Sequence, residues 1–370
     1  MDDSGGGMVL KNNHGVALLI TVSIMLVLVT VGLEMNRKTR TSTLTAGAVQ
    51  NRRQMRYMAE SATNLAMAVL RSDARQSRTD SVQELWADEK KLNALAASLG
   101  CDTGDIHIEI TDEMGKIQIN ALLKNFPGHE VNMDQYQIWE AFLYAVLSEN
   151  DAISDMDPSK IVNPLVDWMD SKDADTTTGL SGAESAYYME LDPPYHCPNR
   201  EISHVKELFL VKGGTKALES DSPTGEDGIA SSIHRFLTVH GAVTTGRGRY
   251  RFPGKININT ASEPVIASLL PFGKRDLAEE IIQYRTARES EQGQFTNDLT
   301  VDGWYAHVVN LTQTEEKALK KLTTLSSDIF SIQCEITRHG KTLEMNTTVR
   351  RNKNKNGRIE INIIRQTTQL

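Results

Sequence analysis

The stretch that decides the fold is Val16–Leu33, which reads VALLITVSIMLVLVTVGL and contains no charged residue. At 1.5 Å per residue, a helix of this length reaches roughly 27 Å, about the thickness of the hydrocarbon core of a bilayer. A buried helix of a water-soluble domain is usually shorter or has a polar face, and this stretch has neither feature. The sequence therefore predicts one membrane-spanning helix near the N-terminus.

The helical pattern continues past the apolar stretch. From Glu34 to Ala74 the chain has no proline and only one glycine, and apolar residues recur at helical spacing between Met55 and Leu70. We therefore predict a stalk helix that continues the membrane span to about Leu70. It is either a plain juxtamembrane helix or one long helix that packs against copies or relatives of itself. A polar linker, residues 71–80, is predicted to follow.

Composition sets further limits. A chain of 370 residues has room for two or three domains, and its 39% of hydrophobic residues is ordinary for globular proteins. The net charge of −8 argues against broad nucleic-acid binding, which needs a basic surface. Cys101, Cys197 and Cys334 are far apart and odd in number, so no disulfide framework is indicated, although one bridge could form.

A period-two pattern predicts an antiparallel sheet assembled from two distant segments. Isoleucines alternate with polar residues from Ile106 to Ile110, and Asp112–Gly115 resembles a hairpin turn before Ile117 and Ile119. The pattern returns only within residues 329–365, where Asn356-Gly357 marks another turn. We predict an α+β fold in which residues 105–120 and 329–365 form the sheet and the chain between them is one large insertion.

The insertion is predicted to be mostly helical. Helices are expected at residues 135–147, 158–169, 205–210, 262–270, 274–286 and 315–324, and short strands at 236–243 and 255–259. Outside the insertion, one helix is expected from Glu84 to Leu99. The basic residues of the last hairpin are interpreted as a solvated turn; they are Arg350, Arg351, Lys353, Lys355 and Arg358.

An acidic loop is the strongest candidate for ligand chemistry. Counted from Asp173, the spacing of Asp175, Thr177 and Glu184 follows positions three, five and twelve of a calcium-binding loop. Position six is Thr178 rather than glycine, so a standard EF-hand is not expected. Oxygen ligands on a flexible loop favour calcium over zinc. The alternative is a solvated acidic loop.

A second pattern, residues 255–325, resembles a helix-hairpin-helix unit that grips nucleic-acid phosphates. It begins with Ile256–Ala261 and has the turn Leu270-Pro-Phe-Gly273. Phosphate binding favours two glycines and nearby basic residues, whereas this turn has one glycine and acidic residues crowd the region. A packing unit is therefore the preferred interpretation. No hydrolase, nucleotide-binding or zinc-protease motif occurs, so no enzyme is predicted.

Taken together, these pieces resemble one family over nearly the whole chain. Gly15-Val16 resembles a prepilin peptidase site, and Gly115–Asn120, Val166–Asp170, Gly182–Tyr188 and Pro193–Tyr195 follow in the order found in that family. Asn199, Glu207-Leu208 and the Ile256–Ala261 motif complete the match. The chain is similar to type II secretion minor pseudopilins of the general secretion pathway protein K family.

The resemblance implies a structural role without catalysis. Such a subunit lies at the tip of the secretion pseudopilus and helps to start filament assembly and protein export. Its implied partners are the I-type and J-type minor pseudopilins, the major pseudopilin and prepilin peptidase, with nucleic acid not expected. Two alternatives stay open, namely a DNA-binding minor pilin of an uptake pilus and a plain single-span membrane protein.

The resemblance also assigns residues. It implies cleavage between Gly15 and Val16, then methylation of the new N-terminus. It implies bound calcium near the acidic loop, with Asp167, Asp170, Asp173, Asp175 and Glu184 as candidate ligands. The fifth mature residue is Ile20 rather than the glutamate of most pilin-like subunits. Because a buried glutamate needs a charged partner, its absence suits a subunit at the tip.

The expected organisation follows. Residues 1–15 are a leader, or only residues 8–15 if translation starts at Met8. Residues 16–70 are the membrane and stalk helix, 71–122 and 328–370 the two parts of the pseudopilin domain, and 123–327 the inserted domain with the acidic loop 167–188. The expected location is the bacterial inner membrane, with most of the chain in the periplasm. One feature conflicts with this orientation: Lys11 precedes the span, whereas Arg37, Lys38 and Arg40 follow it.

Overall fold

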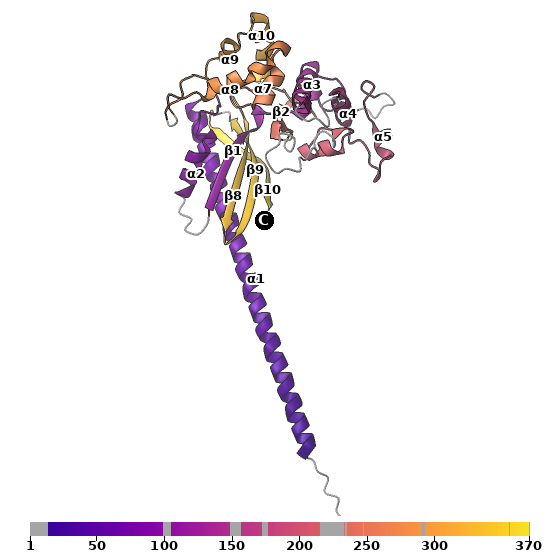
Figure 1. The fold of residues 1–370 in the computed structure, drawn as a ribbon, viewed down its shortest axis with the longest axis vertical. Helices are drawn as coiled ribbons and strands as arrows, with labels where there is room; N and C mark the ends of the chain where they lie inside the picture. Colours follow the sequence, from indigo (N-terminus) through magenta and orange to yellow (C-terminus); the bar gives the residue numbers. More distant parts are fainter. Residues whose placement is uncertain are drawn as a thin grey trace, which may run out of the picture. The chain divides into compact units, whose positions relative to one another are not determined.

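The computed structural model describes residues 14–98, 105–148, 157–171, 177–214, 233, 235–246, 248–290, 293–354 and 356–369. Helix α1, His14–Gln76, runs without a break through the predicted membrane and stalk segments (Figure 1). It ends at Gln76 rather than near Leu70, so the predicted linker is shorter than expected. The chain divides into two compact units between Met58 and Ala59, and α1 contributes residues to both.

The predicted antiparallel sheet is confirmed for four strands. These are β1 (Asp105–Asp112), β8 (Ile329–Arg338), β9 (Lys341–Lys353) and β10 (Ile359–Gln369), in the order β1-β8-β9-β10 (Figure 1). Every neighbouring pair is antiparallel. Gly357, with φ of 75°, lies at the predicted turn between β9 and β10, where a side chain would strain the backbone.

The last turns of α1 pack against the apolar face of this sheet. Ala59, Ala62 and Ala66 are fully buried, and such small residues let a helix approach a sheet closely. The hydroxyl of Thr63 donates to the carbonyl of Ala59 at 2.8 Å and lies 3.5 Å from the sulfur of Cys334. Cys334 is completely buried, and burial raises its pKa to about 11.

The predicted hairpin between residues 106–110 and 117–119 is wrong. Strand β1 pairs with β8 instead, and β2 (Ile117–Gln118) pairs in parallel with β3 (Leu237–Thr238). The turn, η2 (Glu113–Gly115), leads the chain away from the sheet and into the insertion. A Cβ on Gly115 would lie 2.7 Å from the hydroxyl of Thr260, so the bare glycine lets the inserted domain pack tightly here.

The helix predicted from Glu84 to Leu99 is interrupted. It consists of a short 3-10 turn, η1 (Leu85–Ala87), and the helix α2 (Glu89–Ala97). Asp88 lies between them, and its carboxylate accepts the backbone N–H of Lys91 at 3.1 Å. Asp88 therefore starts a new helix as its N-cap. Helical periodicity in the sequence did not reveal this break.

The insertion between β1 and β8 forms its own hydrophobic core, from Ile117 to Leu319. Helices α3 (Met133–Ser148), α4 (Ser159–Met169) and α7 (Glu263–Leu269) confirm three of the predicted helices. Others differ in type or limits: η4 (Val205–Leu210) and η6 (Phe272–Leu277) are 3-10 helices, α8 is Ala278–Thr286, and α10 is Gln313–Leu322.

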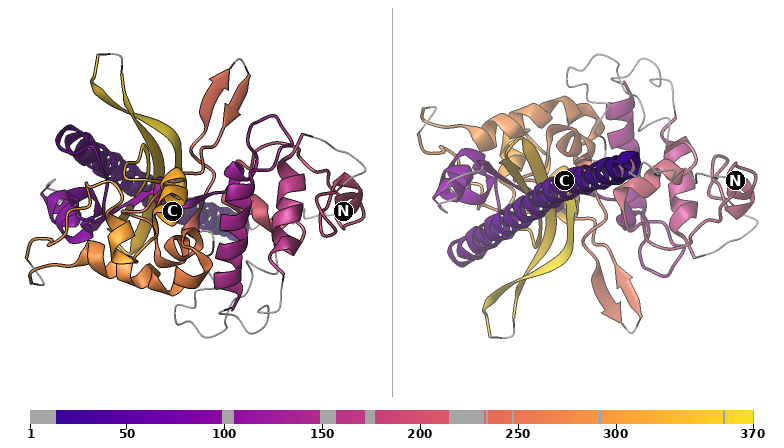
Figure 2. Two further views of the ribbon diagram at one scale, coloured as in Figure 1. Left: turned by 90° about the horizontal axis from the view of Figure 1, so that it is seen from above. Right: turned by 90° about the horizontal axis from the view of Figure 1, so that it is seen from below.

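The strands of the insertion are shorter than predicted. Besides β3, they are β4 (Val243–Gly246), β5 (Arg249–Arg251), β6 (Ile256–Asn257) and β7 (Thr323–Thr324). The hairpin of β4 and β5 extends away from the helices of the insertion (Figure 2). The short 3-10 helix η3 (Ile119–Leu122) and the short helices α5 (Ser185–Met189) and α9 (Trp304–Val308) were not predicted, because so few residues give no clear periodicity.

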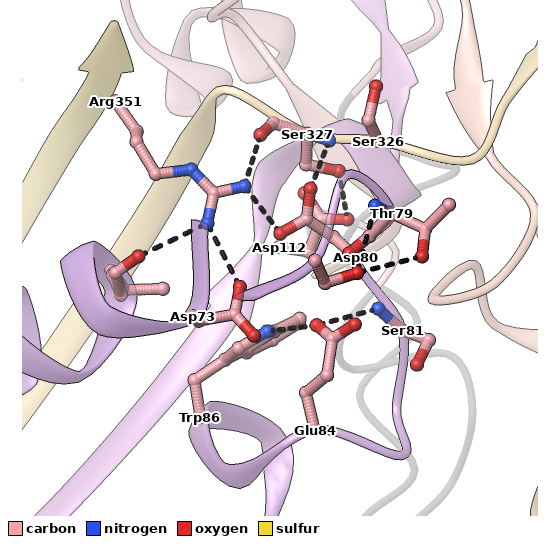
Figure 3. Close-up of polar contacts among 12 residues, drawn as sticks. Asp73, Thr79, Asp80, Ser81, Glu84, Trp86, Asp112, Ser326, Ser327 and Arg351 are labelled. Carbon is pink, nitrogen blue, oxygen red and sulfur yellow. Dashed lines mark hydrogen bonds and ion pairs between the residues drawn. The ribbon is translucent and has the colours of Figure 1, made fainter. Parts of the chain in front are cut away.

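A buried polar network lies where the sheet, the end of α1 and the insertion meet (Figure 3). Asp112, at the end of β1, accepts hydrogen bonds from Asn257 at 3.0 Å, from Thr260 at 2.6 Å and from Ser327 at 2.6 Å. Asn257 also donates to the carbonyl of Asp80 at 3.0 Å. These contacts join segments that are far apart in the chain.

Arg351 corrects the interpretation of the last hairpin as wholly solvated. Its side chain is only 9% exposed and forms ion pairs with Asp73 at 3.1 Å and with Asp80 (Figure 3). It also donates to the carbonyl of Ser327 at 2.9 Å and lies over the ring of Phe330. Position in β9, rather than basic character, decides its burial.

Candidate functional site

The apolar stretch within α1 is fully exposed in the isolated chain. An 18-residue window of the helix Gly15–Gln76 has a mean hydropathy of 2.8 and no buried residue, so it can cross a membrane by length and composition. Its threonines are compatible with a membrane span, because the hydroxyl of Thr21 donates to the carbonyl of Leu18 and that of Thr30 to the carbonyl of Leu26. Gly15 and Val16 are exposed, and Ile20 is 54% exposed.

Three of the five predicted metal ligands converge in the inserted domain. Asp167 comes from the last turns of α4, Asp170 ends that helix, and Glu184 immediately precedes α5. One carboxylate oxygen from each lies within 4.8 Å of the others. All three side chains are buried, with residue exposures of 1%, 9% and 7%. Asp173 and Asp175 lie outside the described residues.

Asp167 is held in place by backbone donors. Its carboxylate accepts the N–H of Thr178 at 2.9 Å and that of Ala183 at 2.8 Å. Burial raises the pKa of Asp167, while these hydrogen bonds and the charge of Lys212 lower it. The loop thus folds around the carboxylate and fixes the direction in which its oxygens point.

Aromatic residues close to these carboxylates in the sequence pack against one another. Trp168 packs edge-on against Tyr188, with ring centroids 5.0 Å apart, and Tyr188 stacks on Tyr195. Tyr188 is completely buried, and its hydroxyl accepts the N–H of Lys212 at 3.2 Å. Cys197 is also buried here, and its sulfur lies 3.5 Å from the carbonyl oxygen of Asp167.

Gly182 is a functional residue that the sequence motifs contained without assigning it a role. A Cβ at this position would lie 2.2 Å from an Oδ of Asp167 and 2.8 Å from the backbone nitrogen of Thr178. Only glycine therefore fits beneath the carboxylate. Its place two residues before Glu184 was the available signal, but the close approach depends on Asp167, which lies far earlier in the sequence.

The donor set fits a calcium ion. Two oxygens bound to one Ca²⁺ at about 2.4 Å are at most about 4.8 Å apart, and one oxygen from each of the three carboxylates lies within that distance of the others. Three buried carboxylates at this separation repel one another strongly, and a divalent cation would remove that repulsion. Carboxylates without histidine or thiolate ligands suit a hard cation. Calcium binding itself stays a prediction.

A second acidic cluster was missed by the sequence analysis. Oxygens of Asp73, Asp80 and Glu84 also lie within 4.8 Å of one another. Here Arg351 supplies a positive charge that pairs with both aspartates, and Glu84 accepts the indole N–H of Trp86 at 2.7 Å (Figure 3). The guanidinium of Arg351 thus supplies the positive charge that a metal ion would otherwise provide. We therefore interpret this cluster as structural.

The helix-hairpin-helix-like unit contributes mainly to the core. Ile256, Ile258, Val265 and Ile266 are completely buried. Arg285, a basic residue of this unit, points inward: its exposure is 6%, and it donates to the carbonyl of Ile258 at 3.0 Å. Burial lowers the pKa of Arg285 to about 10. The packing interpretation accounts for these contacts.

The architecture combines a long helix, an antiparallel sheet and an insertion. A long N-terminal helix with an apolar first part leads to an antiparallel sheet, and a mostly helical domain is inserted between two of its strands. The α+β fold class is confirmed. Residues 115–220 match the family profile of the type II secretion system protein K.

Curated relatives carry the same name. The chain is 25% identical over 207 residues to a putative type II secretion system protein K of Escherichia coli K12, a match that covers 56% of this chain and 59% of that protein. It is 27% identical over 211 residues to protein K of Klebsiella pneumoniae, covering 56% and 60%. It is 28% identical over 213 residues to protein K of Aeromonas hydrophila, covering 55% and 60%. Each match thus spans about three fifths of the relative.

A solved structure shares the fold. The crystal structure of the GspK-GspI-GspJ complex from the type II secretion system of enterotoxigenic Escherichia coli contains a similar chain, with a TM-score of 0.57 and 17% identity. The match covers 87% of this chain and 98% of that one. The resemblance predicted from sequence is confirmed: residues 115–220 match the type II secretion system protein K model, and the chain is similar to curated proteins of that name.

Proposed function

We propose that the chain is a non-catalytic minor pseudopilin of a type II secretion system, positioned at the tip of the pseudopilus. The observation that carries the proposal is the combination of a protein K domain with an exposed apolar helix that continues into a pilin-like sheet. The subunit would help to start the filament and thereby serve protein export across the outer membrane.

The apolar segment Val16–Leu33 would anchor the protein in the inner membrane before assembly, with the unit from Ala59 onward in the periplasm. Prepilin peptidase would cut between Gly15 and Val16, and the new N-terminus would be methylated. The basic residues after the span oppose this orientation, and processing of a pilin-type leader is what would overrule them.

Assembly would use the helix. Most pilin-like subunits carry a glutamate at the fifth mature position, which pairs with the N-terminal amine of a neighbour inside the apolar environment. Here that position is Ile20, whose uncharged side chain needs no charged partner. A subunit of this kind need not dock behind another, which suits the tip. The proposed partners are I-type and J-type minor pseudopilins, supported by the complex in which the similar fold occurs.

Calcium would bind in the inserted domain. Asp167, Asp170 and Glu184 would supply carboxylate oxygens, and Asp173 and Asp175 remain candidates. The ion would neutralise the buried carboxylates and tie the end of α4 to the start of α5. Its role would therefore be structural, holding the loop between these helices in one conformation.

The deciding experiment is the intact mass and N-terminal sequence of the protein isolated from membranes of cells with and without a prepilin peptidase. The expected product is a chain that starts at Val16 and carries an N-methyl group, formed only when the peptidase is present. A chain left uncut in cells that process another pseudopilin would contradict the proposal and favour a plain membrane protein. The matched control is Gly15→Ala in the same cells, in which cleavage should fail.

A further inference from the structure

A groove rich in positive charge lies between the sheet and the inserted domain, on the sheet face opposite α1. Its volume is about 460 Å³. The floor comes from Ser331, Asn346 and Thr348 of β8 and β9. Its titratable side chains are His204, Lys206, His240 and Arg365, together with the pair Glu113 and Lys116. We call this feature the cationic groove.

Among the described residues that line the cationic groove, the only carboxylate is already neutralised. Glu113 pairs with Lys116 at 2.7 Å and accepts the hydroxyls of Thr238 at 2.5 Å and Ser331 at 2.8 Å. Among the residues that the structure describes, neither Lys206 nor Arg365 has an ion-pair partner, and both are exposed. The groove therefore has an excess of positive charge on a chain whose net charge is −8.

The excess positive charge also influences the pKa values of the two histidines, His204 and His240. Burial lowers the pKa of His204, and the charges of Arg365 and Lys206 lower it further, against the opposing charge of Glu207. Burial also lowers the pKa of His240; Glu113 opposes that shift, whereas Lys116, Arg365 and Arg350 add to it. An anion in the groove would be attracted by the same cations that disfavour protonation of the histidines.

Strand β10 forms one side of the groove and is the edge of the sheet. At the other edge, β1 is covered, because Asn93 of α2 accepts the N–H of Ile108 at 2.6 Å. In the described chain no strand pairs with the outer side of β10, whose residues Ile363 and Ile364 are 51% and 45% exposed. A strand edge of this kind can pair with an extended peptide through main-chain hydrogen bonds.

We propose that the cationic groove and the adjoining edge of β10 form a docking site for an acidic, extended segment of a partner protein. Nucleic acid fits less well. Among the described residues, the lining contains no phenylalanine, tyrosine or tryptophan on which a base could stack, and the negative charge of the whole chain repels a long polyanion. The proposal goes beyond the proposed function because it names the chemistry of one contact surface and does not depend on secretion.

The test uses the full chain in a non-ionic detergent and a fluorescein-labelled oligoglutamate peptide, with binding followed by fluorescence anisotropy at low salt. The double variant Lys206→Gln/Arg365→Gln should bind the peptide roughly five- to tenfold more weakly than the unaltered protein. The matched control, Lys353→Gln/Arg358→Gln, removes the same charge from the exposed tip of the β9–β10 hairpin and should change binding less than about twofold. Hydrogen exchange should slow in β10 when the peptide binds.

Three results would overturn the proposal. The first is absence of peptide binding to the unaltered protein. The second is an equal loss of affinity in the groove variant and the tip variant, which would indicate general attraction. The third is displacement of the peptide by single-stranded DNA of equal charge at lower concentration, which would favour nucleic acid. Binding without slower exchange in β10 would contradict the part of the proposal that concerns the strand edge.

Discussion

Arg351 of β9 and Asp80 of the segment after α1 form a buried ion pair across 271 positions of sequence. The side chain of Asp80 is 1% exposed and that of Arg351 is 9% exposed. Asp73, from the last turn of α1, shares the same guanidinium. One side chain therefore ties the helix, the sheet and the segment that follows the helix.

Removing this guanidinium should be costly. We expect Arg351→Met to lower the free energy of unfolding by about 3–5 kcal/mol, because it leaves buried carboxylates without their cation. The measurement is denaturant unfolding of the full chain in detergent, followed by tryptophan fluorescence. Arg358→Met, at the exposed tip of the same hairpin, is the control and should change stability by less than about 0.5 kcal/mol. Equal effects of the two substitutions would contradict a structural role for the ion pair.

Stability should also depend on the protonation of Glu84. Burial and the nearby charge of Asp73 raise the pKa of Glu84 to about 8. A carboxyl whose pKa is higher in the folded state than in the unfolded state binds its proton more tightly when folded. Its contribution to stability is therefore present below the unfolded pKa, near 4.5, and is lost as the pH rises through about 8.

The prediction for Glu84 is tested by comparing melting temperatures between pH 5 and pH 9. The unaltered protein should lose more stability over this range than Glu84→Gln, which cannot ionise. Glu280→Gln, on the exposed first turn of α8, is the matched control and should follow the unaltered protein. Parallel curves for all three proteins would mean that Glu84 is ionised in the folded state at neutral pH.

Calcium should stabilise the inserted domain. At a free concentration of about 100 times the dissociation constant, a ligand that binds only the folded state adds about 2.7 kcal/mol. We expect a chelator to lower the melting temperature of the full chain, and added calcium to restore it. Asp170→Asn should abolish this response, whereas Asp134→Asn, in the first turn of α3, should retain it. A melting temperature that does not change with chelator would contradict calcium binding.

Gly182 should be required for the same response. In Gly182→Ala the new Cβ would meet an Oδ of Asp167 at 2.2 Å, so the carboxylate or the loop must move. We expect weaker calcium binding by isothermal titration and a melting temperature lowered by several degrees. The control is Gly246→Ala in β4, where a Cβ meets nothing within 4 Å. Unchanged calcium affinity in Gly182→Ala would separate this glycine from the metal site.

The identity of the fifth mature residue should matter for function. Placing a charge there costs roughly 2.5–3.5 kcal/mol on membrane-insertion scales unless a partner compensates it. We expect Ile20→Glu to reduce secretion in a strain that depends on this chain, with Ile20→Val as the control of ordinary activity. Normal secretion by Ile20→Glu, at equal protein levels in the membrane, would contradict the tip position.

Much of the fold could be predicted from local pattern. The unbroken helix and the strands β8, β9 and β10 have strong periodicity, so neighbouring residues in the sequence are enough to predict these elements. The partner of β1 could not be found in this way, since period-two alternation identifies a strand without naming its neighbour. The hairpin prediction chose the nearest strand in sequence, whereas β8 lies more than two hundred residues away.

The candidate site was predictable in composition but not in geometry. The Val166–Asp170 and Gly182–Tyr188 motifs contain all three carboxylates that converge. A calcium-loop spacing counted from Asp173 has no position for Asp167, which lies on α4, or for Asp170, which caps the end of that helix. The role of Gly182 and the burial of Arg351 depend on contacts between distant segments, for which a single sequence has no local signal.

The two ends of the insertion meet at one point, where the hydroxyl of Ser327 donates to Asp112 across 215 positions of sequence. For the sheet, the whole inserted domain is thus the loop of a β-hairpin between β1 and β8. Lengthening a short turn to this size costs only about 3–4 kcal/mol of closure entropy, since each doubling adds about 0.6 kcal/mol. A four-stranded sheet of this kind can therefore accept, exchange or lose an entire domain at this hairpin while its strands keep their register, which makes the hairpin a natural place for engineered fusions.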